Sequence, residues 1–187
     1  MNVRRNSVQE ISTGSRAQGW LLWLGVGLLA AFFLSRLIAI DAFPPFLDEM
    51  QHVQEAELSR AVSPFMYTGE GRLFTIWWYM LFQPDTAAPV WLARTATLLV
   101  LLPGYAAVLA VGRLAVGRLA AGRWGLVFVG LVALLSTANF FFERMALADP
   151  ISASAILVAF ALAYRLSWRA SAWDAALTGV ALFVAVG

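Results

Sequence analysis

The chain alternates long apolar runs with short polar segments, and the lengths of the runs predict membrane helices. A helix needs about 20 apolar residues to cross a hydrocarbon core of roughly 30 Å. The predicted spans are residues 20–40, 90–111, 124–141, 150–164 and an incomplete one at 173–187. The pattern predicts an all-α, polytopic transmembrane bundle at residues 20–187, preceded by a polar, non-helical cytoplasmic tail at residues 1–19.

The main polar interruption is the outer loop at residues 41–89, between the first two spans. Pro44 and Pro45 cannot continue a helix, and Asp48 then stands where a helix N-cap would, with Gln51 as its capping-box partner. A helix from about residue 49 to residue 61 is expected to follow. Its apolar content is too low for a crossing, so we expect an amphipathic helix on the outer membrane surface.

A short apolar run at residues 73–82 has only about half the length of a crossing. Its Trp77, Trp78 and Tyr79 favour the headgroup layer, which predicts an interfacial or re-entrant element. An aromatic belt and a groove for a lipid tail both explain these side chains.

Charged residues divide between the two sides that this topology creates. With a cytoplasmic amino terminus, the cytoplasmic segments contain eight arginines against Glu10 and Asp174, and the outer segments contain five arginines and nine of the eleven acidic residues. This asymmetry follows the positive-inside rule. We therefore predict a multi-pass protein of the plasma membrane, the inner membrane in a bacterial cell.

Composition supports a membrane protein and excludes several classes. The chain is 61% hydrophobic and 13% charged, about half the charged fraction of a soluble domain. The absence of cysteine excludes disulfides and thiolate metal sites. A net charge of +2, with arginines spread along the chain, does not indicate a nucleic-acid partner.

Polar residues at the predicted outer face form the candidate site. They are Asp48, Glu49, His52, Glu55, Glu57, Arg94, Glu143, Arg144 and Asp149. Carboxylates and arginines gathered at one face of a membrane bundle indicate a functional site. Arg36, near the outer end of the first span, is explained by a side chain that extends to the headgroups.

Asp48, His52 and Glu55 share one face of the predicted surface helix, where a divalent ion could bind. A lone surface histidine needs no such explanation, and we expect neither a metal nor another cofactor. Asp149 followed by Pro150 is a good N-cap and N1 pair for the fourth span.

The order of these features resembles the amino-terminal portion of the GT-C membrane glycosyltransferases, in particular relatives of the protein O-mannosyltransferases and of the aminoarabinose transferase of lipid A. The shared features are one span, an outer loop with Asp48-Glu49, a surface helix, a short aromatic element, Arg94 entering the second span, and Arg144 ahead of Asp149-Pro150. The resemblance covers nearly the whole chain.

The resemblance implies transfer of a sugar from a polyprenyl-phosphate donor to an acceptor hydroxyl at the outer face. It also implies that membrane lipid surrounds the protein. It implies Asp48 and Glu49 as catalytic carboxylates, with Asp48 taking the acceptor's proton. It implies Arg94 and Arg144 as ligands of the lipid phosphate, with Asp149 and His52 at the substrate. Helix caps explain the two aspartates as well, and headgroup anchors explain the arginines.

Two other functions stay open. One is a non-catalytic truncated membrane protein, which the incomplete run at residues 173–187 favours, and the resemblance likewise implies further spans. The other is a transporter subunit. The transporter is less favoured because the charges gather at one face rather than at mid-membrane, where a permeation path needs them.

Overall fold

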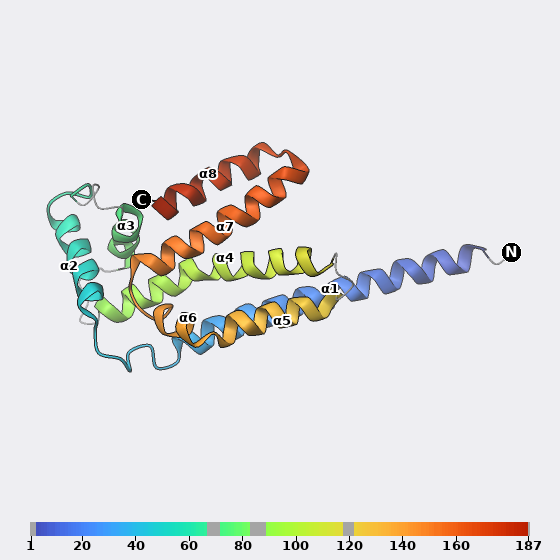
Figure 1. Cartoon of the computed structure of the whole chain (residues 1–187), viewed down its shortest axis with the longest axis horizontal. Coiled ribbons are helices and arrows are strands. Elements are labelled where there is room, and N and C mark those ends of the chain that lie inside the picture. The colour runs from blue at the N-terminus through green and yellow to red at the C-terminus, as the bar shows by residue number, and fades with distance from the viewer. Residues whose placement is uncertain (1–2, 67–71, 83–88, 118–121, 187) are drawn as a thin grey trace.

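The computed structural model describes residues 3–66, 72–82, 89–117 and 122–186, and all the regular elements in these ranges are helices (Figure 1). They are α1 (Val3–Leu37), α2 (Leu47–Ala61), α3 (Leu73–Phe82), α4 (Pro89–Gly117), α5 (Gly122–Leu135), α6 (Thr137–Phe142), α7 (Ala148–Arg169) and α8 (Ala172–Val186). The predicted all-α class is confirmed. Within the described ranges, three segments are long and apolar enough to cross a membrane: Gly19–Leu37, Pro89–Leu114 and Ala148–Arg169.

The long helices run alongside one another, and α2, α3 and α6 lie together at one end (Figure 1). We call this end, with the segments joined to those three helices, the loop end. Helix α4 is central, because it packs against α1, α5 and α7, while α8 packs against α7. The turn between α7 and α8 lies at the opposite end.

The prediction that residues 1–19 are non-helical is wrong for residues 3–19, because α1 begins at Val3 and continues through the first apolar run to Leu37. No proline occurs before Pro44, so nothing stops a helix nucleated in the apolar run from extending toward the amino terminus. The helix ends three residues before the predicted boundary at Ile40, and Ala39 has a left-handed backbone with φ 51°.

The continuous third span predicted at residues 124–141 is also wrong. Helix α5 ends at Leu135, and Ser136 has an extended backbone (φ −61°, ψ 107°) before α6 begins at Thr137. Serine and threonine side chains compete for backbone hydrogen bonds, which makes this Ser-Thr pair a reasonable place for a break. The described apolar part of α5, Trp124–Leu135, is shorter than the three candidate spans.

Neither aspartate caps its helix as predicted. The N-cap of α2 is Phe46 and that of α7 is Leu147, both with extended backbones, so Asp48 and Asp149 lie one position inside the first residue of each helix. At α2 the backbone N–H of Phe46 donates to Glu49 Oε2 at 2.9 Å. Both aspartates still oppose the positive end of a helix dipole.

Helix α3 has the predicted bounds, but an aromatic belt does not describe it. Tyr79 is fully buried and its hydroxyl is 2.7 Å from Thr97 Oγ1, while Trp78 Nε1 donates to the carbonyl of Ala96 at 2.8 Å. Both side chains therefore join α3 to α4. Together with buried side chains of α2 and α7 they form the hydrophobic core of the loop end.

Candidate functional site

Glu49 is fully buried and accepts four hydrogen bonds. Its Oε1 accepts from Arg94 Nε (2.8 Å) and from the backbone N–H of Ala146 (2.7 Å), and its Oε2 accepts from Arg94 Nη2 (2.7 Å) and Phe46 N–H (2.9 Å). Burial alone would raise the pKa of Glu49, but these bonds and the charge of Arg94 hold the pKa below its ordinary value. The ionised carboxylate thus joins α2, α4 and the segment between α6 and α7.

Arg94 uses every donor of its guanidinium inside the protein. Besides the two bonds to Glu49, Nη1 donates to the carbonyls of Ile40 (2.7 Å) and Phe43 (3.1 Å), and Nη2 donates to that of Pro44 (3.3 Å). A guanidinium has five N–H groups, so none is left for a substrate phosphate. The phosphate contact of Arg94 stays a prediction, and this geometry instead favours a role in fixing the loop.

Arg144 binds the same loop as Arg94. Its Nη2 donates to the carbonyls of Ile38 (2.8 Å) and Ala39, and its guanidinium lies over the ring of Phe43, 5.5 Å from the centroid. The two arginines thereby bind five of the seven carbonyls of residues 38–44. We call residues 38–44 the clamped loop.

Arg144 keeps unused donors, unlike Arg94. It is only 8% exposed, its buried Nε makes no hydrogen bond, and both of its side-chain bonds come from Nη2. Burial lowers the pKa of Arg144, as do the charges of Arg94 and Arg36. Among the described residues no carboxylate forms an ion pair with it. A buried arginine without a counter-ion is a candidate anion ligand.

Asp48 stands in the opposite environment to its neighbour Glu49. It is exposed, and within the described ranges no hydrogen bond or ion pair reaches its carboxylate. Consecutive residues of a helix point about 100° apart, so one carboxylate can anchor the first turn of α2 while the other is displayed. The clamped loop enters this turn directly and fixes its position.

Arg36 and Glu143 form a second buried pair that the sequence did not reveal. Arg36 is fully buried, and its Nε and Nη2 lie 2.9 and 2.8 Å from Glu143 Oε2, while Nη1 donates to the carbonyl of Leu134 at 2.9 Å. The expectation that Arg36 extends to the headgroups is therefore wrong. Glu143 directly follows α6 and reaches Arg36 on α1. Burial raises the pKa of Glu143, although Arg36 opposes the shift.

Helix α2 turns polar residues inward. Glu49, His52, Glu55 and Ser59 are buried, and the unbonded buried atoms include His52 Nδ1 and Ser59 Oγ. Burial, with the charge of Arg72, lowers the pKa of His52. The described residues contain no group of three or more His, Asp or Glu side chains that could hold a metal ion.

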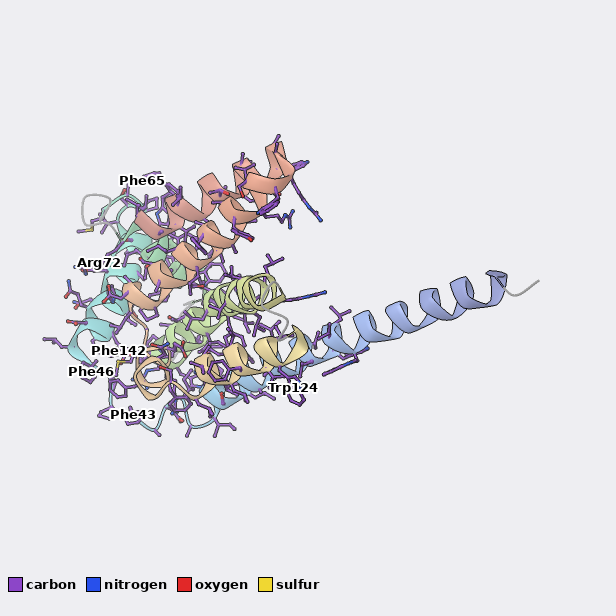
Figure 2. The ribbon with its side chains drawn as sticks, turned by 45° about the vertical axis from the view of Figure 1, so that its right-hand side comes forward. Phe43, Phe46, Phe65, Arg72, Trp124 and Phe142 are labelled. Atoms are coloured by element: carbon purple, nitrogen blue, oxygen red, sulfur yellow. The ribbon has the colours of Figure 1, made fainter. Side chains whose placement is uncertain are left out.

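Exposed aromatic rings gather beside the clamped loop. Figure 2 shows Phe43, Phe46 and Phe142 close together at the loop end. All three pack edge to face on Phe141, with centroid distances of 5.7, 6.4 and 5.5 Å. About half of each of the three outer rings remains exposed. Contiguous exposed apolar surface of this kind marks a contact with a ligand, a membrane or a partner.

Asp149 lies apart from the residues around the clamped loop. It lines a 410 Å³ cavity together with four other residues that carry polar groups, Asn139, Glu143, Ser154 and Tyr105, and the apolar walls include Phe32, Leu101 and Leu157. The cavity lining does not include the other predicted site residues, which are Asp48, Glu49, His52, Arg94 and Arg144. A separate hollow of 250 Å³ is lined by Arg94 and by Asp41, which sequence reasoning did not select. The predicted site therefore divides into a clamped-loop group and a cavity group.

Comparison of the chain with protein-family models, with curated proteins and with solved structures finds no match.

Proposed function

We propose that this chain is a multi-pass plasma-membrane protein of the GT-C glycosyltransferase kind. It moves a sugar from a polyprenyl-phosphate donor to an acceptor hydroxyl at the outer face. Support for the membrane placement comes from the three apolar helices, with the acidic α2 and its neighbours at one end and Arg113, Arg165 and Arg169 toward the other. The loop end is then the outer face, and the amino terminus is cytoplasmic.

One observation carries the proposal: Asp48 is an unengaged carboxylate on a rigidly anchored helical turn. Glu49 and Arg94 fix that turn from inside, and the two arginines fix the loop that precedes it. A general base gains most from such positioning, because its oxygen need not be oriented during the reaction. A helix cap no longer explains Asp48, since Phe46 holds the cap position.

The proposed reaction assigns one step to each group. Asp48 takes the proton of the acceptor hydroxyl as the acceptor oxygen bonds to the anomeric carbon. The bond between that carbon and the donor phosphate oxygen breaks, and the phosphate leaves with the electron pair. Arg144, with donors to spare, stabilises the phosphate charge. Glu49 and Arg94 are positioning residues. His52 is buried one turn after Asp48 on the same helix, and Asp149 lines the separate 410 Å³ cavity.

The test is a transfer assay with a labelled polyprenyl-phosphate sugar, in membranes that contain the protein expressed from its full open reading frame. Asp48→Asn should lower transfer by about 100-fold or more, the usual contribution of a general base. Glu57→Gln, an exposed carboxylate of the same helix, is the matched control and should leave transfer unchanged. Full transfer by Asp48→Asn would contradict the proposal.

Arg144 offers a second, independent check. Arg144→Gln should raise KM for the lipid-linked donor and lower kcat, because a phosphate ligand stabilises both the bound donor and the leaving group. If Arg144 only holds the loop that precedes Asp48, Arg144→Gln should instead lower kcat and leave KM for the lipid-linked donor unchanged.

Orientation can be measured cleanly because the chain contains no cysteine. Single cysteines at Glu57 and Arg113, both exposed, should react with a membrane-impermeant maleimide only from the outer and only from the cytoplasmic side, respectively. Labelling of both from one side would contradict the topology.

A non-catalytic membrane protein is the second candidate. The observation in its favour is that the Glu49–Arg94 and Arg36–Glu143 pairs are satisfied within the chain, as in a structural protein. Correct insertion without transfer in any form of the protein would establish this candidate.

A further inference from the structure

A groove runs along α4 between α5 and α7. It consists of the 410 Å³ cavity at the loop end and a second cavity of 270 Å³, and Val108 and Leu157 line both. Its residues on α4 extend from Leu101 to Gly112, about 16 Å of helix at 1.5 Å per residue. Figure 1 shows α5 and α7 on either side of α4, and both pack against it.

The groove is polar at one end only. The second cavity is lined entirely by apolar residues and glycine, among them Val111, Val129 and Phe160. Polar side chains occur at the loop end, where Asn139, Glu143 and Asp149 line the first cavity. A lipid molecule has this same division, with one polar head and a long apolar chain.

The charge at the polar end selects the head group. Arg36 neutralises Glu143, and the hydroxyl of Ser154 donates to the carbonyl of Val100 at 2.7 Å. Asp149 is exposed, and in the described part of the chain nothing bonds its carboxylate. The mouth of the groove therefore presents one carboxylate that is not paired with a cation, and this carboxylate complements the cationic part of a head group.

We propose that this groove binds an acyl chain of a phospholipid with a primary ammonium head group, phosphatidylethanolamine being the type, and that Asp149 pairs with the ammonium. The proposal rests on the membrane placement under the proposed function but not on sugar transfer. The lipid occupies the site as a resident ligand beside the Arg36–Glu143 pair.

The experiment uses the full chain, reconstituted in vesicles of equal phosphatidylethanolamine and phosphatidylglycerol and extracted into mild detergent. Native mass spectrometry counts the lipids that remain bound. We expect one phosphatidylethanolamine per chain in preference to phosphatidylglycerol. Asp149→Asn should keep a bound lipid but reduce that preference about two- to five-fold, the effect of one partly exposed ion pair.

A matched pair of variants tests the location. Leu157→Trp fills the stretch that both cavities share and should reduce the retained lipid about ten-fold. Ile156→Trp places the same ring on the neighbouring position of α7, which is 56% exposed and lines neither cavity, and should leave retention unchanged. Circular dichroism checks that both variants keep the helical content of the parent.

Three outcomes would overturn the proposal: no retained lipid, equal retention by Leu157→Trp and the parent, or no preference between the two lipids. Crosslinking from a photoreactive residue at Val108 to a second copy or to another protein would also overturn it. Loss of sugar transfer in Asp48→Asn is measured separately. Lipid retention can therefore fail while the proposed function stands, or hold while the proposed function fails.

Discussion

Glu49 binds Arg94 through both carboxylate oxygens across 45 positions of the chain, at 2.8 Å to Nε and 2.7 Å to Nη2. Both side chains are almost completely buried. Burying such a pair costs the desolvation of both charges, so the pair contributes more to fixing one arrangement of the helices than to net stability. Removing one partner, however, leaves a buried charge without its counter-ion.

Glu49→Gln should therefore lower the free energy of unfolding by about 3–5 kcal/mol. The first turn of α2 should loosen, and trypsin should cut faster at exposed Arg60 in that helix. Glu57→Gln should stay within about 0.5 kcal/mol of the parent, as expected for a surface change. Arg94→Lys should also destabilise the protein, because lysine keeps the positive charge but loses the planar guanidinium that binds both oxygens of Glu49. Equal melting temperatures for Glu49→Gln and the parent would refute this role.

The loop end should weaken in mild acid because of His52. Burial lowers the pKa of His52 from its ordinary value of 6.5, so the unfolded state binds a proton before the folded state does. The stability contributed by neutral His52 is complete above about pH 6.5 and is lost progressively as the pH falls below that value. Amide hydrogen exchange in α2 should accelerate over this range.

His52→Gln should flatten that pH dependence while leaving a second loss at lower pH. The pKa of Glu49 is also depressed, so its contribution is present above the ordinary carboxyl value of 4.5 and disappears as the pH falls through the folded-state pKa. An unchanged exchange profile between pH 7 and pH 5 in His52→Gln would show that His52 does not titrate with folding.

Gly104 allows α4 and α7 to approach closely. A Cβ added at Gly104 would lie 2.2 Å from Ser154 Oγ and 2.9 Å from Ser154 Cα. Gly104→Ala should therefore destabilise the chain by about 1–3 kcal/mol through overpacking. Gly25→Ala is the matched control, since its Cβ would meet nothing within 4 Å, and replacing a helical glycine there should be neutral or slightly stabilising.

Ser154→Gly should partly rescue Gly104→Ala, because it removes two of the three nearest atoms while leaving the backbone atom. Thermal unfolding of the single and double variants in one detergent measures the coupling. Additive effects would place the strain elsewhere.

An ion pair between buried Asp174 and exposed Arg165 also joins the two sides of the turn at the opposite end. Asp174 on α8 is fully buried and accepts from Arg165 Nε (2.9 Å) and Nη2 (2.5 Å) on α7. Asp174→Asn should cost about 1.5–3 kcal/mol, the usual value of hydrogen bonds to charged groups. Arg169→Gln, an exposed change on α7, should cost less than about 0.5 kcal/mol. A double-variant cycle with Arg165→Gln would show no coupling if the pair is unimportant.

Local patterns predicted the local features well. Apolar length and flanking prolines located α2, α3 and α4, because each depends mainly on its own residues. The N-cap prediction for α2 was wrong because the side chain of Glu49, rather than that of Asp48, accepts the backbone hydrogen bond at the start of the helix. The break at Ser136 was not predicted, because it lies inside an apolar run and a count of hydrophobic residues does not reveal it.

The site was only partly predictable for a different reason. The sequence selected Glu49, Arg94 and Arg144 by type and membrane side, but it could not show that Arg94 and Glu49 use each other. It also did not reveal that Arg36 and Glu143 pair with each other across 107 positions. Such pairing depends on how helices cross, and no spacing within one helix encodes it.

Arg94 and Arg144 bind the clamped loop through main-chain carbonyls, so these hydrogen bonds do not depend on which side chains the loop carries. Every residue type offers the same carbonyl oxygen. An exposed position such as Asp41 can therefore be exchanged during evolution without loss of the hydrogen bonds that hold the loop before Asp48. A scaffold of this kind lets the outer surface of the loop change while the position of the exposed Asp48 carboxylate stays constant.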